Sequence, residues 1–218
     1  MNAFDPSFDD LPESLPIFPL PGVLLLPRGR LPLNIFEPRY LAMVSDAMGR
    51  ARMIGMLQPK DPSARDTNPS VYRTGCAGRI VNFEETDDGR LLITLLGCSR
   101  FDVRDELPLS RGYRAVVPDW TRYRQDLDQP EPCEIDRDRL LSGLRGFFEL
   151  HGIEVDWDNV REAENERLIN MVAMVCPFEP PEKQALLEAE DLRERAETLI
   201  ALVEMAILST ANDDAAQQ

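Results

Sequence analysis

The first apolar stretch of the chain, residues 15–43, is repeatedly interrupted by proline. Six of the 18 prolines lie in it, which excludes one long helix, while its apolar content exceeds that of a solvated loop. We therefore predict strands at 15–20 and 22–26, kinked at their prolines, and then a helix over about 38–49. Pro38 suits the first position of that helix, where its missing N–H costs nothing. The face predicted to be buried consists of Tyr40, Leu41, Val44 and Met48.

Alternating apolar and polar residues predict further strands up to residue 118. Asp87, Asp88 and Gly89 suit a tight hairpin turn between two of them. The polar, turn-rich segment 58–72 is predicted to be a mobile loop. The predicted strands cover 53–57, 74–86, 90–96, 100–104 and 113–117. This first region should therefore be mostly β-structure with one early helix, closed as a barrel or a curled sheet.

Beyond residue 135 the apolar residues recur at the spacing of a helix. The first helix carries an apolar stripe that begins at Leu140 and should end before Gly152. The second should begin near Asn159, in a capping-box-like arrangement with Glu162, and end at Cys176. Pro180 should open a third, short helix, and Asp191 with Glu194 should cap a fourth. The second region is therefore predicted to be a small helical bundle.

This change of period predicts the α+β class and two regions of different character. Segments without periodicity separate or flank them. The predicted divisions are a flexible leader (1–14), a β-region (15–118), a linker (119–134), a helical bundle (135–208) and a flexible tail (209–218).

Charge is unevenly distributed between these regions. The net charge of the 218-residue chain is −15, and nearly all of the excess acid lies after residue 118. An acidic region repels phosphates, which disfavours generic nucleic-acid binding. The acidic start of the chain does not suit a secretory signal, and its apolar runs are too short to span a bilayer. We expect a cytoplasmic protein that does not insert into membranes.

The residues needed for common catalytic sites are missing or badly placed. The chain has only two lysines, Lys60 and Lys183, and neither lies in the glycine-rich motif of a P-loop. Its single histidine, His151, is predicted to cap a helix, so a packed or capping role is favoured over catalysis. Four widely spaced cysteines without a C-x-x-C pair do not suit a zinc site. We predict no enzyme activity, no metal and no cofactor.

Two groups of aromatic residues are candidates for binding a ligand. Core packing is the competing interpretation for the first group, and a linker clamped onto the domain is the competing interpretation for the second. The second group combines rings with arginines, so any nucleic-acid site would start there. The candidate residues are Phe36 and Tyr40 in the first group, and Trp120, Arg122, Tyr123 and Arg124 in the second.

The ordered motifs of the chain resemble a known family. The run PIFPLPGVLLLPRGRLPLNIFEPRYLAMV is similar to the amino-terminal, substrate-binding domain of Lon-type ATP-dependent proteases, especially its free-standing bacterial versions. The resemblance continues in order through MIGMLQP, then GCAGRIVNFEETDDGRLLITLLGCSRF, and finally PPEKQALLEAEDLRERAETLIALVE. It covers most of residues 15–208.

This resemblance implies a PUA-like, six-stranded β-barrel followed by a helical bundle, and a role in recognising protein substrates. The ATPase and Ser-Lys protease segments of Lon have no counterpart here, so proteolysis is not carried over. The predicted function is therefore a non-catalytic module, adaptor-like or chaperone-like, that binds unfolded proteins or exposed apolar segments. Weak self-association stays open. The alternative is a PUA-like RNA-binding domain, which rests on analogy of fold and on the second aromatic group.

Overall fold

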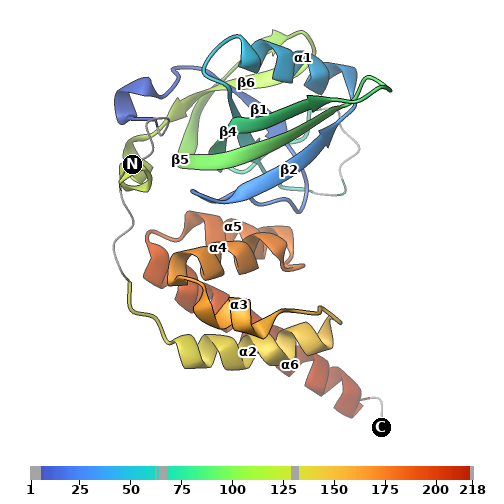
Figure 1. The fold of residues 1–218 in the computed structure, drawn as a ribbon, viewed down its shortest axis with the longest axis vertical. Coiled ribbons are helices and arrows are strands. Elements are labelled where there is room, and N and C mark those ends of the chain that lie inside the picture. Colours follow the sequence, from blue (N-terminus) through green and yellow to red (C-terminus); the bar gives the residue numbers. More distant parts are fainter. Residues whose placement is uncertain (1–5, 62, 64–67, 129–132, 217–218) are drawn as a thin grey trace.

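The computed structural model describes residues 6–61, 63, 68–128 and 133–216, and it places the strands and the first α-helix above the remaining α-helices (Figure 1). The strands are β1 (Leu15–Pro19), β2 (Arg30–Ile35), β3 (Met53–Leu57), β4 (Thr74–Glu85), β5 (Leu91–Ser110) and β6 (Tyr113–Asp119). The α-helices are α1 (Pro38–Met48), α2 (Arg137–Leu150), α3 (Trp157–Glu162), α4 (Asn165–Val175), α5 (Pro180–Glu188) and α6 (Leu192–Ala216). Short 3₁₀ helices are η1 (Phe8–Asp10) and η2 (Thr121–Leu127). The predicted α+β class, with six strands followed by helices, is confirmed.

The six strands form one sheet in the order β2-β5-β4-β3-β1-β6, and β6 also pairs with β5. This last pairing closes β5, β4, β3, β1 and β6 into a ring, and among the described residues β2 is attached to β5 only. All neighbours are antiparallel except β1 and β3, which run parallel. The long strand β5 makes the closure possible, because its first half pairs with β2 and its second half with β6. The predicted strands 90–96 and 100–104 are thus parts of one strand.

The predicted strand at 22–26 is wrong. These residues form an irregular segment whose leucines, Leu24 to Leu26, are at most 2% exposed. The apolar run therefore reflects burial on all sides and not pairing in a sheet. The segment crosses β5 at Gly97, where an added Cβ would lie 2.0 Å from the carbonyl oxygen of Leu26.

Helix α1 begins at Pro38 as predicted, but its buried face is shifted. Tyr40 and Val44 are buried, whereas Leu41 and Met48 are only partly buried. Met43 and Ala47 fill the remaining buried positions.

The predicted helix 159–176 is interrupted. Asp156, and not Asn159, caps the first piece, α3, by accepting from the N–H groups of Asp158 and Asn159. The chain is extended at Ala163 and Glu164 before α4 begins. The predicted linker also contains structure, because Thr121–Leu127 forms η2. Helix α6 runs on to Ala216, beyond the end expected near residue 208.

One apolar cluster joins the strands to the helices. It includes Phe18 and Ile54 from the sheet and Leu144, Leu168 and Leu199 from the helices. A smaller cluster lies around Phe101 within the ring of strands. No helix among the described residues is long and apolar enough to cross a membrane.

Candidate functional site

A pocket of about 400 Å³ opens where the end of β1, the start of α1 and the 58–72 segment meet. Five prolines contribute to its wall, and we call it the proline pocket. Apolar side chains of β1, β2 and α1 supply much of the rest. The lining residues are Phe18, Pro19, Leu20, Pro21, Pro32, Leu33, Asn34, Phe36, Glu37, Arg39, Tyr40, Pro59, Asp61 and Pro69. The tip of the 58–72 segment lies outside the described residues, but Pro59 and Val71 form a bridge at its base.

The structure brings the first predicted pair, Phe36 and Tyr40, together in this pocket. Phe36 is 62% exposed, an unusual state for a phenylalanine on a folded domain. Tyr40 is buried, with its ring centroid 4.1 Å from that of Phe18, and burial raises the pKa of its hydroxyl. The Arg39 guanidinium lies over the Tyr40 ring and pairs with Glu37 at 2.9 Å. Phe36 is therefore available to a ligand, whereas Tyr40 is part of the wall.

The second predicted group is largely turned toward the protein itself. Trp120 is buried, and its Nε1–H donates to the carbonyl of Pro12 at 3.3 Å. Tyr123 is 1% exposed. The two arginines are exposed, but Arg122 lies over the Tyr123 ring and Arg124 over the ring of Phe8. These contacts hold Phe8 and Pro12 in place, and they leave neither Trp120 nor Tyr123 open for base stacking.

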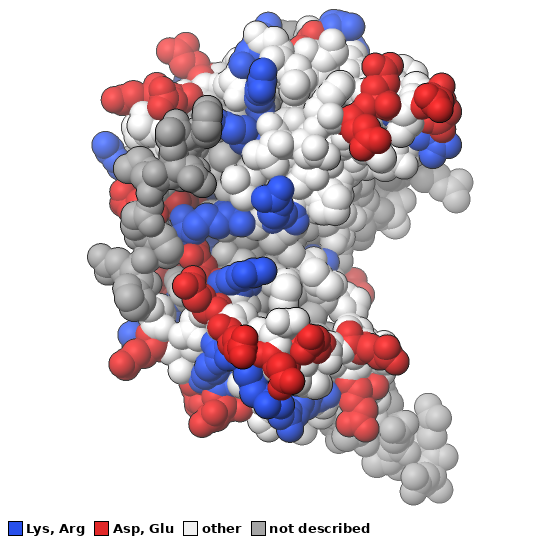
Figure 2. Space-filling model, in the orientation of Figure 1, with Lys and Arg blue, Asp and Glu red and all other residues white. Residues whose placement is uncertain are grey.

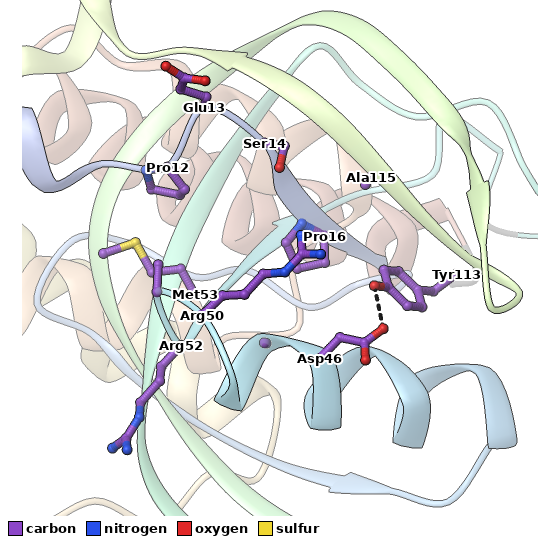
Figure 3. Close-up of a pocket in the computed structure, with 12 residues that line it drawn as sticks. Pro12, Glu13, Ser14, Pro16, Asp46, Arg50, Arg52, Met53, Tyr113 and Ala115 are labelled. Carbon is purple, nitrogen blue, oxygen red and sulfur yellow. Dashed lines mark hydrogen bonds between the residues drawn. The ribbon is translucent and has the colours of Figure 1, made fainter.

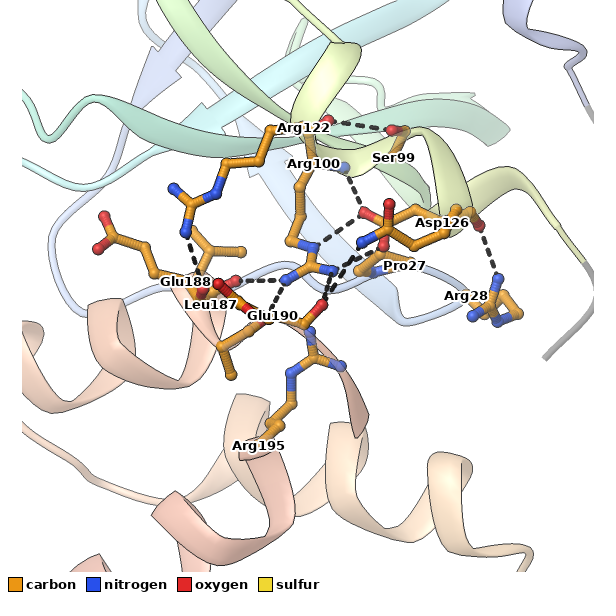
Figure 4. A network of polar contacts seen from close by, with 12 residues as sticks. Pro27, Arg28, Ser99, Arg100, Arg122, Asp126, Leu187, Glu188, Glu190 and Arg195 are labelled. Atoms are coloured by element: carbon orange, nitrogen blue, oxygen red, sulfur yellow. Dashed lines mark hydrogen bonds and ion pairs between the residues drawn. The ribbon is translucent and has the colours of Figure 1, made fainter. Parts of the chain in front are cut away.

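An additional polar network, not predicted from the sequence, lies between the sheet and the helices (Figure 4). Arg100 on β5 is 2% exposed and forms two hydrogen bonds with the Asp126 carboxylate of η2, at 2.8 and 2.9 Å. Its guanidinium also donates to the carbonyls of Leu187 and Ala189, at the end of α5. The only signal in the sequence was a lone arginine at the end of an apolar strand. The network joins the two regions and is not accessible to a ligand.

A second pocket, of about 300 Å³, lies between the start of β1 and the end of α1 (Figure 3). The Arg50 side chain extends over it toward Pro16, while Arg52 points away. Asp46 accepts a hydrogen bond from the Tyr113 hydroxyl at 2.8 Å, which lowers the pKa of that carboxyl. The pocket combines charged side chains of both signs with apolar ones, among them Pro16, Met53 and Ala115.

The described residues contain no group of three or more His, Cys, Asp or Glu side chains that could hold a metal ion. His151 caps the end of α2 with its ring 4.3 Å from that of Phe147. Lys183 is buried, donates to the carbonyl of Gly22 at 2.7 Å, and has its pKa lowered by desolvation. The four cysteines are free. Figure 2 shows both signs of charge interleaved over the helices and an uncharged area over the strands.

A family model for the substrate-binding domain of the ATP-dependent protease La (LON) matches residues 14–204. The chain belongs to this Lon substrate-binding domain family. Among its relatives, the Lon protease of Dictyoglomus thermophilum is 26% identical over 93% of this chain, and Lon protease 2 of Sorangium cellulosum is 28% identical over 93%. The chain spans about a quarter of the length of these Lon proteases, 26% in both.

Two solved Lon domains share the fold. The Lon N-terminal domain protein from Xanthomonas campestris superimposes with a TM-score of 0.60 at 24% identity, over 86% of this chain and 97% of that one. The N-terminal domain of the Mycobacterium avium complex Lon protease gives a TM-score of 0.59 at 14% identity, over 88% and 98%. The predicted resemblance to the Lon domain family is thus confirmed.

Proposed function

We propose that this chain is a non-catalytic module that binds exposed apolar segments of unfolded proteins, in an adaptor-like or chaperone-like role. The observation that carries the proposal is the proline pocket with Phe36 exposed at its edge. An exposed aromatic beside an apolar concave surface is the usual form of a peptide anchor site. Membership of a substrate-binding domain family adds support.

The proline pocket is better suited to apolar than to charged ligands. Its charged side chains are Glu37, Arg39 and Asp61, of which the first two form an ion pair. Prolines and aliphatic side chains provide apolar surface without competing hydrogen-bond donors. Binding should therefore come mainly from burial of apolar area.

The test is a titration with reduced, carboxymethylated α-lactalbumin, a permanently unfolded protein. Phe36→Ala should weaken binding by roughly 10- to 150-fold, because burial of a phenylalanine ring contributes about 1.5–3 kcal/mol. The matched control is Phe83→Ala, which removes another exposed phenylalanine, 43% exposed on the β4–β5 hairpin. Equal weakening by both variants, or no binding by the unchanged protein, would contradict the proposal.

Salt dependence separates this function from RNA binding. Binding through apolar contacts should change little as salt rises, whereas RNA binding should weaken steeply. A tight, salt-sensitive complex with single-stranded RNA that survives Phe36→Ala would favour the RNA alternative.

A further inference from the structure

Strand β2 has an outer edge that faces the proline pocket. It lies at one end of the strand order and pairs with β5 alone. Within the described residues no strand lies on its other side. Pro32, Leu33 and Asn34 of this strand line the pocket. An unpaired strand edge beside a concave surface is a template for another strand.

The register shows which backbone groups of β2 point outward. The N–H of Gly97 on β5 donates to the carbonyl of Gly29 at 2.8 Å, in line with the pairing of Arg30 with Leu96. Hydrogen-bonded and non-bonded pairs alternate in an antiparallel ladder, so the odd-numbered residues of β2 face β5. The N–H and C=O groups of Arg30 and Asn34 therefore point away from β5, together with the carbonyl of Pro32.

Pro32 fits this register, since a proline is tolerated where its missing N–H would face outward. Its partner in the ladder is Thr94, and no ladder bond is lost there. No backbone hydrogen bond from the described residues reaches the outward groups of Arg30, Pro32 or Asn34. All three residues are exposed, so their outward backbone groups are open to pair with an added strand.

The opposite wall of the pocket is also an open strand end. The pairing of β1 with β6 stops at Ile17 and Arg114. Phe18 and Pro19 continue past it, and the strand that pairs with them in the described part of the chain is β3, on their other side. Both residues line the pocket. The wall of strands is therefore open between β1 and β2 at this point.

We propose that an extended peptide segment of a client protein binds in this opening by adding a strand to the outer edge of β2. Its backbone pairs with both outward groups of Asn34 and donates to the carbonyl of Pro32. Alternate side chains of the segment then enter the proline pocket, which favours small or β-branched apolar residues at every second position. This inference rests on the proposed function and specifies how the same site recognises its ligand.

The test compares two substitutions at one position. Asn34→Pro and Asn34→Ala both remove the side chain, which is exposed on the strand, but only the proline removes the outward N–H. With carboxymethylated α-lactalbumin as the probe, Asn34→Ala is the reference for Asn34→Pro, because it removes the pocket-lining side chain but keeps the outward N–H. Asn34→Pro should bind roughly 5- to 10-fold more weakly than Asn34→Ala, as expected for one lost hydrogen bond. Circular dichroism establishes that both variants are folded.

A second measurement leaves the protein unchanged, in case Asn34→Pro does not fold. A terminally blocked peptide of alternating valine and serine is compared with the same peptide methylated on two successive central amides, one on each of its edges. Strand addition predicts that methylation abolishes binding.

The possible results separate the two proposals. Equal binding by Asn34→Pro and Asn34→Ala, or by the two peptides, would overturn strand addition while leaving apolar binding at Phe36 intact. Absence of binding to the unchanged protein would overturn both.

Discussion

Arg100 carries a charge that is buried between the sheet and the helices. Its guanidinium is buried between β5 and η2, and its charge is balanced by one carboxylate, that of Asp126. A desolvated ion pair contributes little net stability as a whole, but removal of one partner leaves the other charge buried and unpaired. The carbonyls of Leu187 and Ala189 satisfy further donors of Arg100.

Asp126→Asn should therefore destabilise the protein by about 3–5 kcal/mol, measured by urea denaturation at neutral pH. The matched control is Glu204→Gln, the same acid-to-amide change in the exposed pair that Glu204 forms with Arg139 at 2.7 Å. That variant should unfold at the same urea concentration as the unchanged protein, because exposed ion pairs contribute little to the free energy of unfolding. Similar effects of the two substitutions would show that the buried pair has no special role.

At the residue scale, aromatic candidates could be found from the sequence but their exposure could not. Phe36 and Trp120 are both aromatic residues next to charged ones, yet one is 62% exposed and the other 9%. The difference arises from distant parts of the chain, since Trp120 is covered through its contacts with Pro12 and Phe101. Local sequence carries no information about such contacts.

At the scale of elements, the crossing of the 22–29 segment over β5 depends on Gly97. The Gly97 carbonyl accepts from the N–H of Arg28 at 2.8 Å, and its Cα lies against the backbone of Leu26. Any side chain there would meet backbone atoms, which cannot rotate out of the way.

Gly97→Ala should consequently destabilise the protein by about 3 kcal/mol, the upper end of the usual cost of overpacking. Gly49→Ala is the control, because Gly49 has a φ of −78° and an added Cβ would lie 3.6 Å from the nearest atom. That change should be neutral or stabilise by up to about 1 kcal/mol. Thermal denaturation of both variants tests the contrast, and a tolerated Gly97→Ala would mean that the crossing can shift.

Helix breaks were harder to predict than helix starts. Proline and acidic caps are local signals, and they correctly predicted the starts of α1, α5 and α6. The break between α3 and α4 has no such signal. Arg137 on α2 donates to the carbonyls of Val160, Arg161 and Ala163, which stabilises the end of α3 from another helix. Propensity along the chain cannot anticipate that contact.

For the whole molecule, the shared apolar cluster predicts that strands and helices unfold together. The chain has two tryptophans, Trp120 beside the sheet and Trp157 on α3. Trp120→Phe leaves Trp157 as a fluorescent reporter of the helices, and Trp157→Phe leaves Trp120 as a reporter of the sheet. In both variants the fluorescence transition should coincide with the loss of helical circular dichroism.

Separate transitions in these measurements would instead indicate two independently stable domains. They would favour the predicted boundary at 119–134 as a true linker. Coincident transitions would make that boundary a change of secondary structure within one cooperative unit.

The pairing of Ile17 with Arg114 has a consequence for the protein during its synthesis. At typical translation rates, β1 emerges on the order of ten seconds before β6, the partner that completes the ring. In that interval an apolar strand edge is exposed on the nascent chain, where it could associate with other chains. Pro16, Pro19 and Pro21 interrupt this stretch at short intervals and hinder such association. Pro19 and Pro21, which line the proline pocket in the folded protein, should thus also hinder association before the chain has folded.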